Sequence, residues 1–270
     1  MFERIIHRWL RVPYRLHVRQ LQNPRKPRAT VVLIHGIGSS SLMWQRLMQS
    51  KLVAKDVRVI AIDLLGFGKS PRPHWKTYDV ATQTKSLATT LLAEKITGPV
   101  VLVGHSLGAL VAVNYASSLP NILVKSLILC SPPLYNPEGA SRLTERQLRA
   151  MYRKFIEAPE LSKVIASDLA QKYRLMNPGF QVDESNLPIF LDTLDAAIVN
   201  QNSLQQVAKL KQPIDIFYGQ FDPVVISKNL KRLARRKSIT LTKLLTSSHE
   251  IDGRYAKRLA RTVNQHLEKL

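Results

Sequence analysis

The sequence predicts an α/β fold in which helices cover both faces of a mostly parallel sheet. Short apolar runs rich in Val, Ile and Leu alternate with longer amphipathic stretches, as is typical of parallel strands joined by crossover helices. One of these runs leads into a glycine-flanked serine and then into small apolar residues, which indicates a strand, a sharp turn and a helix. The length of 270 residues is sufficient for one large domain with a substantial core.

The expected strands are short and separated by turn or helix signals. In chain order they span residues 14–18, 30–34, 57–62, 99–103, 124–129, 214–218 and 239–245. We place the first of them at an edge of the sheet. A helix is predicted over residues 79–96, because its apolar residues form a stripe and Gly98 follows its end. The stripe consists of Val80, Leu87, Leu91 and Leu92.

The strand pattern is interrupted after residue 132 and resumes only at Ile214. Residues 133–205 are rich in charge and in helical patterning and carry no strand signal. An insertion between two strands of this kind is expected to form a helical cap over the carboxyl edge of the sheet. The sequence therefore predicts a core made of residues 1–132 and 206–270, with a cap at 133–205.

The most informative motif is Gly104-His105-Ser106-Leu107-Gly108. It follows an apolar strand-like run and precedes a run of small apolar residues, which is the context that a nucleophile elbow needs. The serine of such an elbow has strained backbone geometry, and a Cβ on either flanking glycine would collide with the neighbouring strand or helix. Ser106 is therefore the candidate nucleophile.

A serine hydroxyl is a weak nucleophile at neutral pH and needs an adjacent base, which in turn needs an orienting acid. In a doubly wound sheet these groups come from loops at the carboxyl ends of strands. Asp222 follows the predicted strand at 214–218, and His249 follows the last predicted strand. These two residues are the candidate acid and base.

Further motifs complete the pattern. They are Leu33-Ile34-His35-Gly36-Ile37-Gly38, Asp63-Leu64-Leu65-Gly66-Phe67-Gly68-Lys69-Ser70 and Gly219-Gln220-Phe221-Asp222-Pro223-Val224-Val225. With them the chain resembles the α/β-hydrolase superfamily over almost all of its length outside the cap. The order Ser, Asp, His along the chain is the order expected for that superfamily.

The resemblance implies an oxyanion hole made by the backbone N–H groups of Ile37 and Leu107. For Leu107 the physics agrees, because the N-terminus of a helix offers unpaired amides and a dipole that favour developing negative charge. Residues that would bind the rest of the substrate are not identified by the sequence.

Other residues compete for these roles. We expect His35 to orient the oxyanion loop through hydrogen bonds, and His105 to point away from Ser106. Asp215 lies inside a predicted strand and Asp63 is expected to stabilise its own turn, so both are weaker candidates for the acid. Trp44 is expected to pack in the core.

The resemblance implies a serine hydrolase that cleaves a carboxylic ester of a small or lipid-like molecule through an acyl-enzyme, with no metal and no organic cofactor. Three alternatives stay open at this point. They are a carbon–carbon bond hydrolase of ring-cleavage products, an acyltransferase, and a non-catalytic binding protein of the same fold.

The formal net charge of +21 is unevenly distributed. Residues 136–200 are nearly neutral, with nine acidic and eight basic residues, whereas residues 223–248 contain no acid. The basic residues of that stretch are Lys228, Lys231, Arg232, Arg235, Arg236, Lys237 and Lys243. Such a surface attracts polyanions, namely nucleic acid, anionic lipid headgroups or acidic cell-surface polymers. Together with the arginine-rich residues 1–11 it is a candidate surface for peripheral association with an anionic membrane. Because no nucleic-acid-binding motif accompanies the charge, we favour a solvated basic face over a nucleic-acid site.

The first eleven residues predict an amphipathic basic helix, which either lies peripherally on an anionic membrane or packs back onto the core. No segment approaches the ~20 apolar residues that a membrane span needs, and the N-terminal region does not resemble a secretory signal. Cys130 is the single cysteine and excludes an internal disulfide. Cytoplasmic residence is the default expectation.

Overall fold

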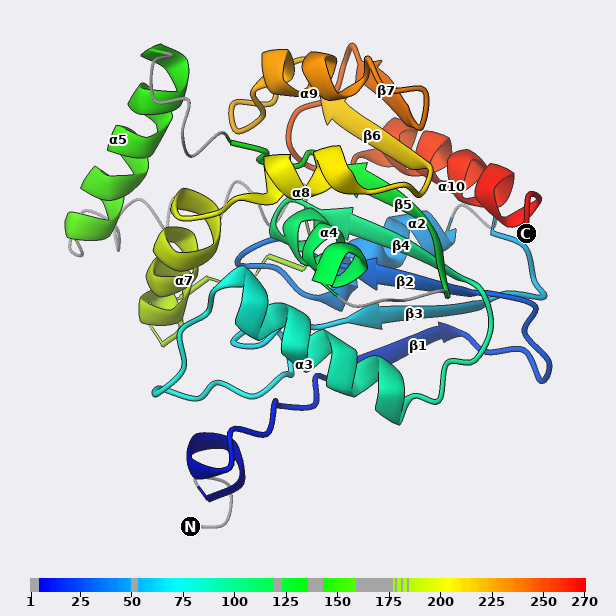
Figure 1. Cartoon of the computed structure of the whole chain (residues 1–270), viewed down its shortest axis with the longest axis horizontal. Coiled ribbons are helices and arrows are strands. Elements are labelled where there is room, and N and C mark those ends of the chain that lie inside the picture. Colours follow the sequence, from blue (N-terminus) through cyan, green and yellow to red (C-terminus); the bar gives the residue numbers. More distant parts are fainter. Residues whose placement is uncertain are drawn as a thin grey trace.

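A seven-stranded sheet with strand order β1-β3-β2-β4-β5-β6-β7 forms the centre of the fold (Figure 1). The structure is a computed structural model that describes residues 5–49, 53–118, 123–135, 143–158, 177, 179–180, 182–183 and 185–270. The strands are β1 (Val18–Gln22), β2 (Thr30–Ile34), β3 (Arg58–Ile62), β4 (Val100–His105), β5 (Val124–Cys130), β6 (Ile214–Gly219) and β7 (Ile239–Leu244). All neighbouring strands are parallel except β1 and β3. The predicted fold class is confirmed.

The first strand was predicted in the wrong place. Residues 14–18 were expected to form it, but the antiparallel pairing with β3 begins only where Val18 faces Ile62. Leu16 is buried, yet its backbone N–H donates to the hydroxyl of Thr90 at 2.8 Å. The alternating apolar pattern before Val18 therefore reflects burial of an extended segment and not a strand. The other expected strands lie within two residues of their predicted ends.

Alternate residues of the central strands face two separate apolar layers, because successive strand side chains point to opposite faces. Val32 and Ile34 of β2 pack in the layer with α3 (Val80–Ala93) and α4 (Leu107–Ser118). Val31 and Leu33 pack in the layer with α2 (Gln45–Gln49) and α10 (Gly253–Leu267). Helices on both faces explain why β2 is apolar at almost every position.

The helix expected over residues 79–96 is α3. Asp79 caps its N-terminus, since the side-chain oxygen accepts a hydrogen bond from the N–H of Thr82 at 2.6 Å. The helix ends earlier than predicted because Lys95 adopts a left-handed conformation with φ 53°.

Between β5 and β6 the described chain is helical. It contains α5 (Leu143–Glu157), α7 (Leu187–Thr193), η3 (Leu194–Val199) and α8 (Ser203–Lys209). Figure 1 shows α5 and α7 beyond the arrowheads of the parallel strands, whereas α8 packs beside α4. Much of the predicted cap, including residues 136–142 and 159–176, lies outside the described residues. The division into core and cap stays a prediction.

The N-terminal helix is shorter than expected where the structure describes it. A single π-helical turn, η1, spans Ile5–Trp9, and the chain then reverses at Arg11, which has φ 55°. Residues 1–4 lie outside the described residues. None of the helices in the described ranges is long and apolar enough to cross a membrane.

Candidate active site

Ser106 occupies the sharp turn between β4 and α4. Its φ of 51° is left-handed, and its N–H donates to the carbonyl of Cys130 on the neighbouring strand β5 at 2.9 Å. A Cβ on Gly104 would overlap the backbone of Gly108, and a Cβ on Gly108 would overlap the backbone of Ile34. The two glycines thus allow the close packing of strand and helix that holds the serine in this strained geometry.

His249 and Asp222 are brought together by the loops that follow β7 and β6. The Nδ1 atom of His249 lies 3.0 Å from each carboxylate oxygen of Asp222. The carboxylate also accepts the N–H of Val224 at 2.9 Å, and its side chain is fully buried. Gly219 permits the approach of the two loops, because a Cβ there would overlap the backbone of residues 247 and 248.

The contact between Asp222 and His249 shifts the pKa of each group so that its charged form is favoured. Burial alone would raise the pKa of Asp222, but the hydrogen bond and positive charge of His249 outweigh it and hold that pKa below its usual value. Burial alone would lower the pKa of His249, but the hydrogen bond with Asp222 outweighs it and raises that pKa. Asp222 therefore stabilises the imidazolium form of His249.

Ile37 and Leu107 present backbone N–H groups near the elbow. Leu107 is the first residue of α4, and within the described part of the chain neither N–H donates to a protein acceptor. A Cβ on Gly36 would lie 3.0 Å from the Cβ of Ser106, so the loop that carries Ile37 packs directly on the elbow. The two N–H groups are thus free to bind a ligand oxygen.

His35 ties this loop to the core. Its Nδ1 atom lies 2.6 Å from the carbonyl of Gly36, and its Nε2 atom accepts the N–H of Leu64 at 2.9 Å. The first contact needs a proton on Nδ1 and the second needs a free lone pair on Nε2, so the ring is neutral. Burial lowers the pKa of His35 accordingly. These contacts agree with the expected orienting role.

His105 was expected to point away from Ser106, and the structure shows in addition that it contacts His249. Its ring lines the same cavity as Ser106, with its centroid 4.9 Å from that of His249. The Nε2 atom donates to the carbonyl of His249 at 2.9 Å, which fixes the backbone of that residue. Burial, together with positive charge on His249, lowers the pKa of His105 to about 3. His105 therefore stays neutral and supports the His249 loop.

The remaining competitors take structural roles. Asp63 accepts the N–H groups of Ser41 at 2.6 Å and Lys69 at 3.0 Å and so stabilises its own turn. Asp215 pairs with His266 of α10 at 2.6 Å. Trp44 is fully buried in the layer beneath the sheet.

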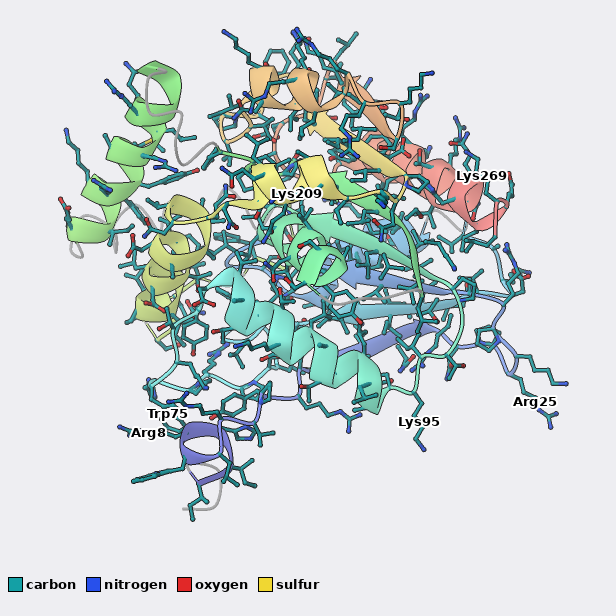
Figure 2. All side chains as sticks on the ribbon, viewed as in Figure 1. Arg8, Arg25, Trp75, Lys95, Lys209 and Lys269 are labelled. Carbon is teal, nitrogen blue, oxygen red and sulfur yellow. The ribbon has the colours of Figure 1, made fainter. Side chains whose placement is uncertain are left out.

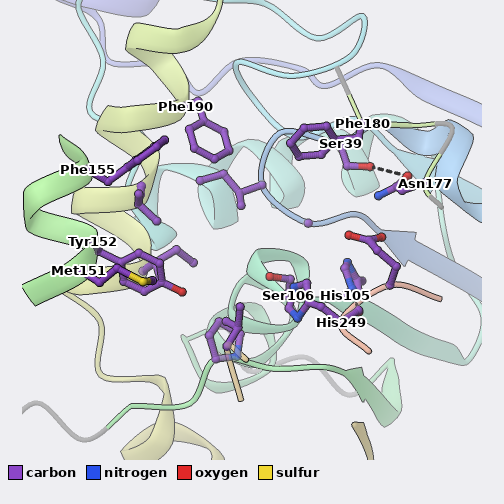
Figure 3. Close-up of a pocket in the computed structure, with 17 residues that line it drawn as sticks. Ser39, His105, Ser106, Met151, Tyr152, Phe155, Asn177, Phe180, Phe190 and His249 are labelled. Atoms are coloured by element: carbon purple, nitrogen blue, oxygen red, sulfur yellow. Dashed lines mark hydrogen bonds between the residues drawn. The ribbon is translucent and has the colours of Figure 1, made fainter. Parts of the chain in front are cut away.

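A cavity of about 350 Å³ opens over Ser106 and His249. Its far wall is apolar, and Figure 3 shows the rings of Tyr152, Phe155 and Phe190 facing Ser106 across the space. α5 supplies the first two of these side chains and α7 supplies the third. The helices between β5 and β6 thus line the cavity but contribute neither Ser106 nor its candidate partners.

Three polar residues of the cavity wall were missed by the sequence analysis. Glu250 lines the cavity with 6% of its surface exposed, and one of its carboxylate oxygens has no hydrogen-bond partner among the described residues. Burial raises the pKa of Glu250. Ser39 donates to Asn177 at 3.3 Å beside it (Figure 3). The position of Glu250 next to His249 was a usable signal, whereas Asn177 lies in a stretch without a motif.

The described residues contain no group of three or more His, Cys, Asp or Glu side chains that could hold a metal ion. Cys130 is buried, and burial raises the pKa of its thiol to about 12.

Comparisons with known proteins agree on one family. A family model described as alpha/beta hydrolase fold matches residues 29–251. The chain is 31% identical over 145 residues to a probable lysophospholipase, BODYGUARD 2 of Arabidopsis thaliana, covering 53% of this chain and 31% of that protein. It is 28% identical over 229 residues to the pimeloyl-[acyl-carrier protein] methyl ester esterase of Pseudoalteromonas atlantica, covering 78% of this chain and 84% of that protein.

The aligned part of the chain spans less than a third of the length of the plant relatives. Among solved structures, MenH from S. aureus superposes with a TM-score of 0.73 at 18% identity, covering 94% of this chain and 98% of that one. An esterase from Exiguobacterium antarcticum superposes with a TM-score of 0.71 at 18% identity, covering 94% of this chain and 95% of that one. At these identities the superpositions establish the shared fold.

Proposed function

The chain belongs to the α/β-hydrolase fold family, and we propose that it is a serine hydrolase that cleaves a carboxylic ester through an acyl-enzyme. The observation that carries this proposal is the convergence of three separate loops on one cavity. Ser106, His249 and the N–H-bearing loop at Ile37 line it together, and Asp222 lies behind His249.

In the proposed mechanism the hydroxyl oxygen of Ser106 attacks the ester carbonyl while His249 accepts its proton. The carbonyl electrons move onto the oxygen, which accepts hydrogen bonds from the N–H groups of Ile37 and Leu107. The intermediate collapses to an acyl-serine, and the alcohol leaves with the proton from His249. Water then attacks the acyl carbon with His249 again as base, which releases the acid and restores Ser106.

Asp222 would assist by orientation and charge. Its contact with Nδ1 of His249 keeps a proton on that atom, so that Nε2 is the basic nitrogen. Its negative charge stabilises the imidazolium that forms at each step. The acid itself stays ionised throughout.

The cavity favours an apolar acyl group. Aromatic and aliphatic side chains from α5, α7 and η3 face Ser106, and the volume of about 350 Å³ fits a short or medium chain. Two relatives, a methyl ester esterase and a probable lysophospholipase, also support an ester substrate. We therefore propose a small or lipid-like ester as substrate.

A chain-length series of p-nitrophenyl esters tests this function. The wild type is expected to hydrolyse short or medium esters, and Ser106→Ala to lose roughly 10³-fold or more of the rate. Ser126→Ala is the matched control, because Ser126 is buried in β5 and does not line the cavity. Absence of hydrolysis across the series by a folded wild type would favour a non-catalytic binding protein.

A further inference from the structure

A second cavity, of about 220 Å³, lies at the edge of the molecule where the chain begins. Basic side chains converge on it from three segments, together with hydroxyl groups from the first half of α3. The lining residues that carry these groups are Arg8, Arg11, Lys76, Lys85, Thr82 and Ser86. Figure 2 shows Arg8 beside Trp75, another residue of the same wall.

The four cations of this cavity have no charge partner in the part of the chain that the structure describes. Among the residues that the structure describes, none of the four forms an ion pair with a carboxylate. Arg8, Arg11 and Lys85 are exposed, and Lys76 is half-buried. Like charges that converge on one cavity repel each other, so a bound anion would relieve the repulsion and accept hydrogen bonds from the hydroxyls.

Large exposed apolar side chains belong to the same N-terminal segment as Arg8 and Arg11, which line this basic cavity. Ile5, Trp9, Leu10 and Val12 are exposed, and Trp9 has 79% of its surface accessible. Exposed apolar groups beside basic ones are the pattern of an interfacial membrane anchor, in which aromatic rings enter the headgroup region. A basic cavity for a small soluble anion does not need exposed apolar side chains in the same segment.

The exposed turn is held in place by the folded core. The N–H of Leu10 donates to the carbonyl of Ile5 at 3.0 Å, which closes the π-helical turn. The ring of His7 stacks on Tyr14 with centroids 3.7 Å apart, and its Nδ1 atom lies 2.8 Å from the carbonyl of Val12. Because Tyr14 is itself buried, the turn presents its apolar side chains from a fixed position.

This edge also lies beside the wall of the active-site cavity. The segment that contributes Trp75 and Lys76 continues to Tyr78, whose N–H donates to the carboxylate of Asp192 on α7 at 3.0 Å. The same helix places Phe190 in the active-site cavity. In Figure 1 the N-terminal turn lies toward the end of the sheet at which α7 is found.

The basic segment at 223–248 is a separate region. It spans α9 (Ser227–Leu233) and β7, and β7 and β1 are the opposite edge strands of the sheet. Figure 1 accordingly shows α9 and the N-terminal turn at opposite ends of the view. In the segment 223–248, all of which the structure describes, only Leu245 is a large exposed apolar side chain, whereas the N-terminal edge combines four exposed apolar side chains with a cavity lined by four cations.

We propose that the N-terminal edge docks on a bilayer that contains anionic phospholipid. A headgroup phosphate enters the cavity of Arg8, Arg11, Lys76 and Lys85, and the side chains of Trp9 and Leu10 enter the interface beside it. The docking goes beyond the proposed hydrolysis and does not depend on it, because binding is measured without turnover.

Co-sedimentation with phosphatidylcholine vesicles, with and without phosphatidylglycerol, tests the docking. The wild type is expected to bind only the anionic vesicles. The double variant Arg8→Gln/Arg11→Gln is expected to bind about 30-fold more weakly. Each cation near an anionic surface contributes ~1 kcal/mol, and the loss of two such contributions corresponds to that factor. Lys231→Gln/Arg232→Gln removes the same charge from exposed positions of α9 and is expected to weaken binding less than about threefold.

Equal weakening by the two double variants would overturn the proposal in favour of a general charge effect, as would failure of the wild type to bind. Unfolding temperatures establish that both variants are folded. Addition of free glycerol 3-phosphate distinguishes the two sources of a phosphate group. The proposal predicts that millimolar amounts leave vesicle binding intact, and displacement would instead assign the cavity to a small soluble anion.

The fluorescence of Trp9 gives an independent measurement. Trp9 is exposed, Trp75 is half-buried and Trp44 is fully buried, so insertion is expected to shift mainly the emission of Trp9 to shorter wavelength on addition of anionic vesicles. Trp9→Phe keeps an aromatic ring and is expected to bind with most of the shift lost. A full shift in that variant would contradict insertion of Trp9.

Discussion

The contact between Asp222 and His249 shows how the proposed chemistry depends on single groups. Asp222 is buried, yet its pKa is held below the usual value, because backbone N–H groups and His249 replace the water that it loses. Asp215 has a comparable histidine partner, His266, but that pair packs outside the cavity. An Asp–His pair is therefore a catalytic candidate only where it lies at the cavity, as Asp222 and His249 do.

Asp222→Asn is expected to lower kcat by roughly 10³- to 10⁴-fold with the fold intact, because a neutral amide favours the wrong tautomer of His249 and does not stabilise its imidazolium. Asp215→Asn is the matched control and is expected to change kcat less than about threefold. Steady-state kinetics on a soluble ester measures both. The reverse ranking would show that the acid was assigned to the wrong residue.

Glu250→Gln is expected to move the acid limb of the kcat/KM profile to lower pH. The base must be neutral, so kcat/KM rises as pH rises through the pKa of His249. The negative charge of Glu250 contributes to raising that pKa, and the amide removes the charge. The plateau rate should change far less than in Asp222→Asn. An unmoved limb would mean that Glu250 carries no charge in that pH range.

At the scale of elements, one basic residue of the 223–248 segment does not belong to a solvated face. Arg236 instead binds the C-terminal end of a helix. The Nη1 and Nη2 atoms of Arg236 donate to the carbonyls of Val207 and Leu210 at 2.9 and 2.6 Å. These carbonyls lie at the C-terminus of α8, where a positive charge also interacts favourably with the helix dipole. A count of charges along the sequence does not distinguish this arginine from its exposed neighbour Arg235.

Arg236→Ala is therefore expected to lower the free energy of unfolding by about 2 kcal/mol, the usual range for hydrogen bonds from a charged group. Arg235→Ala, which removes an exposed side chain of the same type, is expected to change it by less than about 0.5 kcal/mol. Urea denaturation measures both variants. Equal effects would argue against the capping role of Arg236.

The helices over the cavity are expected to govern substrate choice. Phe155→Ala enlarges the apolar side of the cavity, so preference should move toward longer acyl chains, with a change of about tenfold in the ratio of kcat/KM values. Leu92→Ala, at an exposed position on α3, serves as the control and should leave the ratio unchanged. Loss of activity on every ester in a folded Phe155→Ala would show that α5 helps to build the catalytic centre.

At the scale of the whole molecule, the strand order accounts for the site. β2, β4, β6 and β7 end at the same edge of the sheet, so loops that begin near residues 35, 106, 222 and 249 meet although more than 200 residues separate the first from the last. The sequence allowed this prediction because each loop follows a segment with a recognisable strand pattern. Parallel strands place such loops on one edge.

The features that the sequence did not predict depend on contacts between distant segments. The position of β1 depends on a hydrogen bond from Leu16 to Thr90 of α3, which no local pattern reveals. The place of His105 in the cavity depends on the carbonyl of His249, far along the chain. Asn177 contacts Ser39 although 138 residues separate the two in the sequence. Local propensity carries no information about such pairings.

Covalent labelling tests the central claim most directly. A fluorophosphonate forms a stable adduct with a serine that is activated by an adjacent base. Labelling also needs N–H donors beside the serine that stabilise the negative charge on the phosphonyl oxygen. The wild type is expected to gain one adduct, located by peptide mass spectrometry on the peptide that contains Ser106, and Ser106→Ala to gain none. A folded wild type that stays unlabelled, or an adduct on another residue, would contradict the assignment of Ser106 as nucleophile.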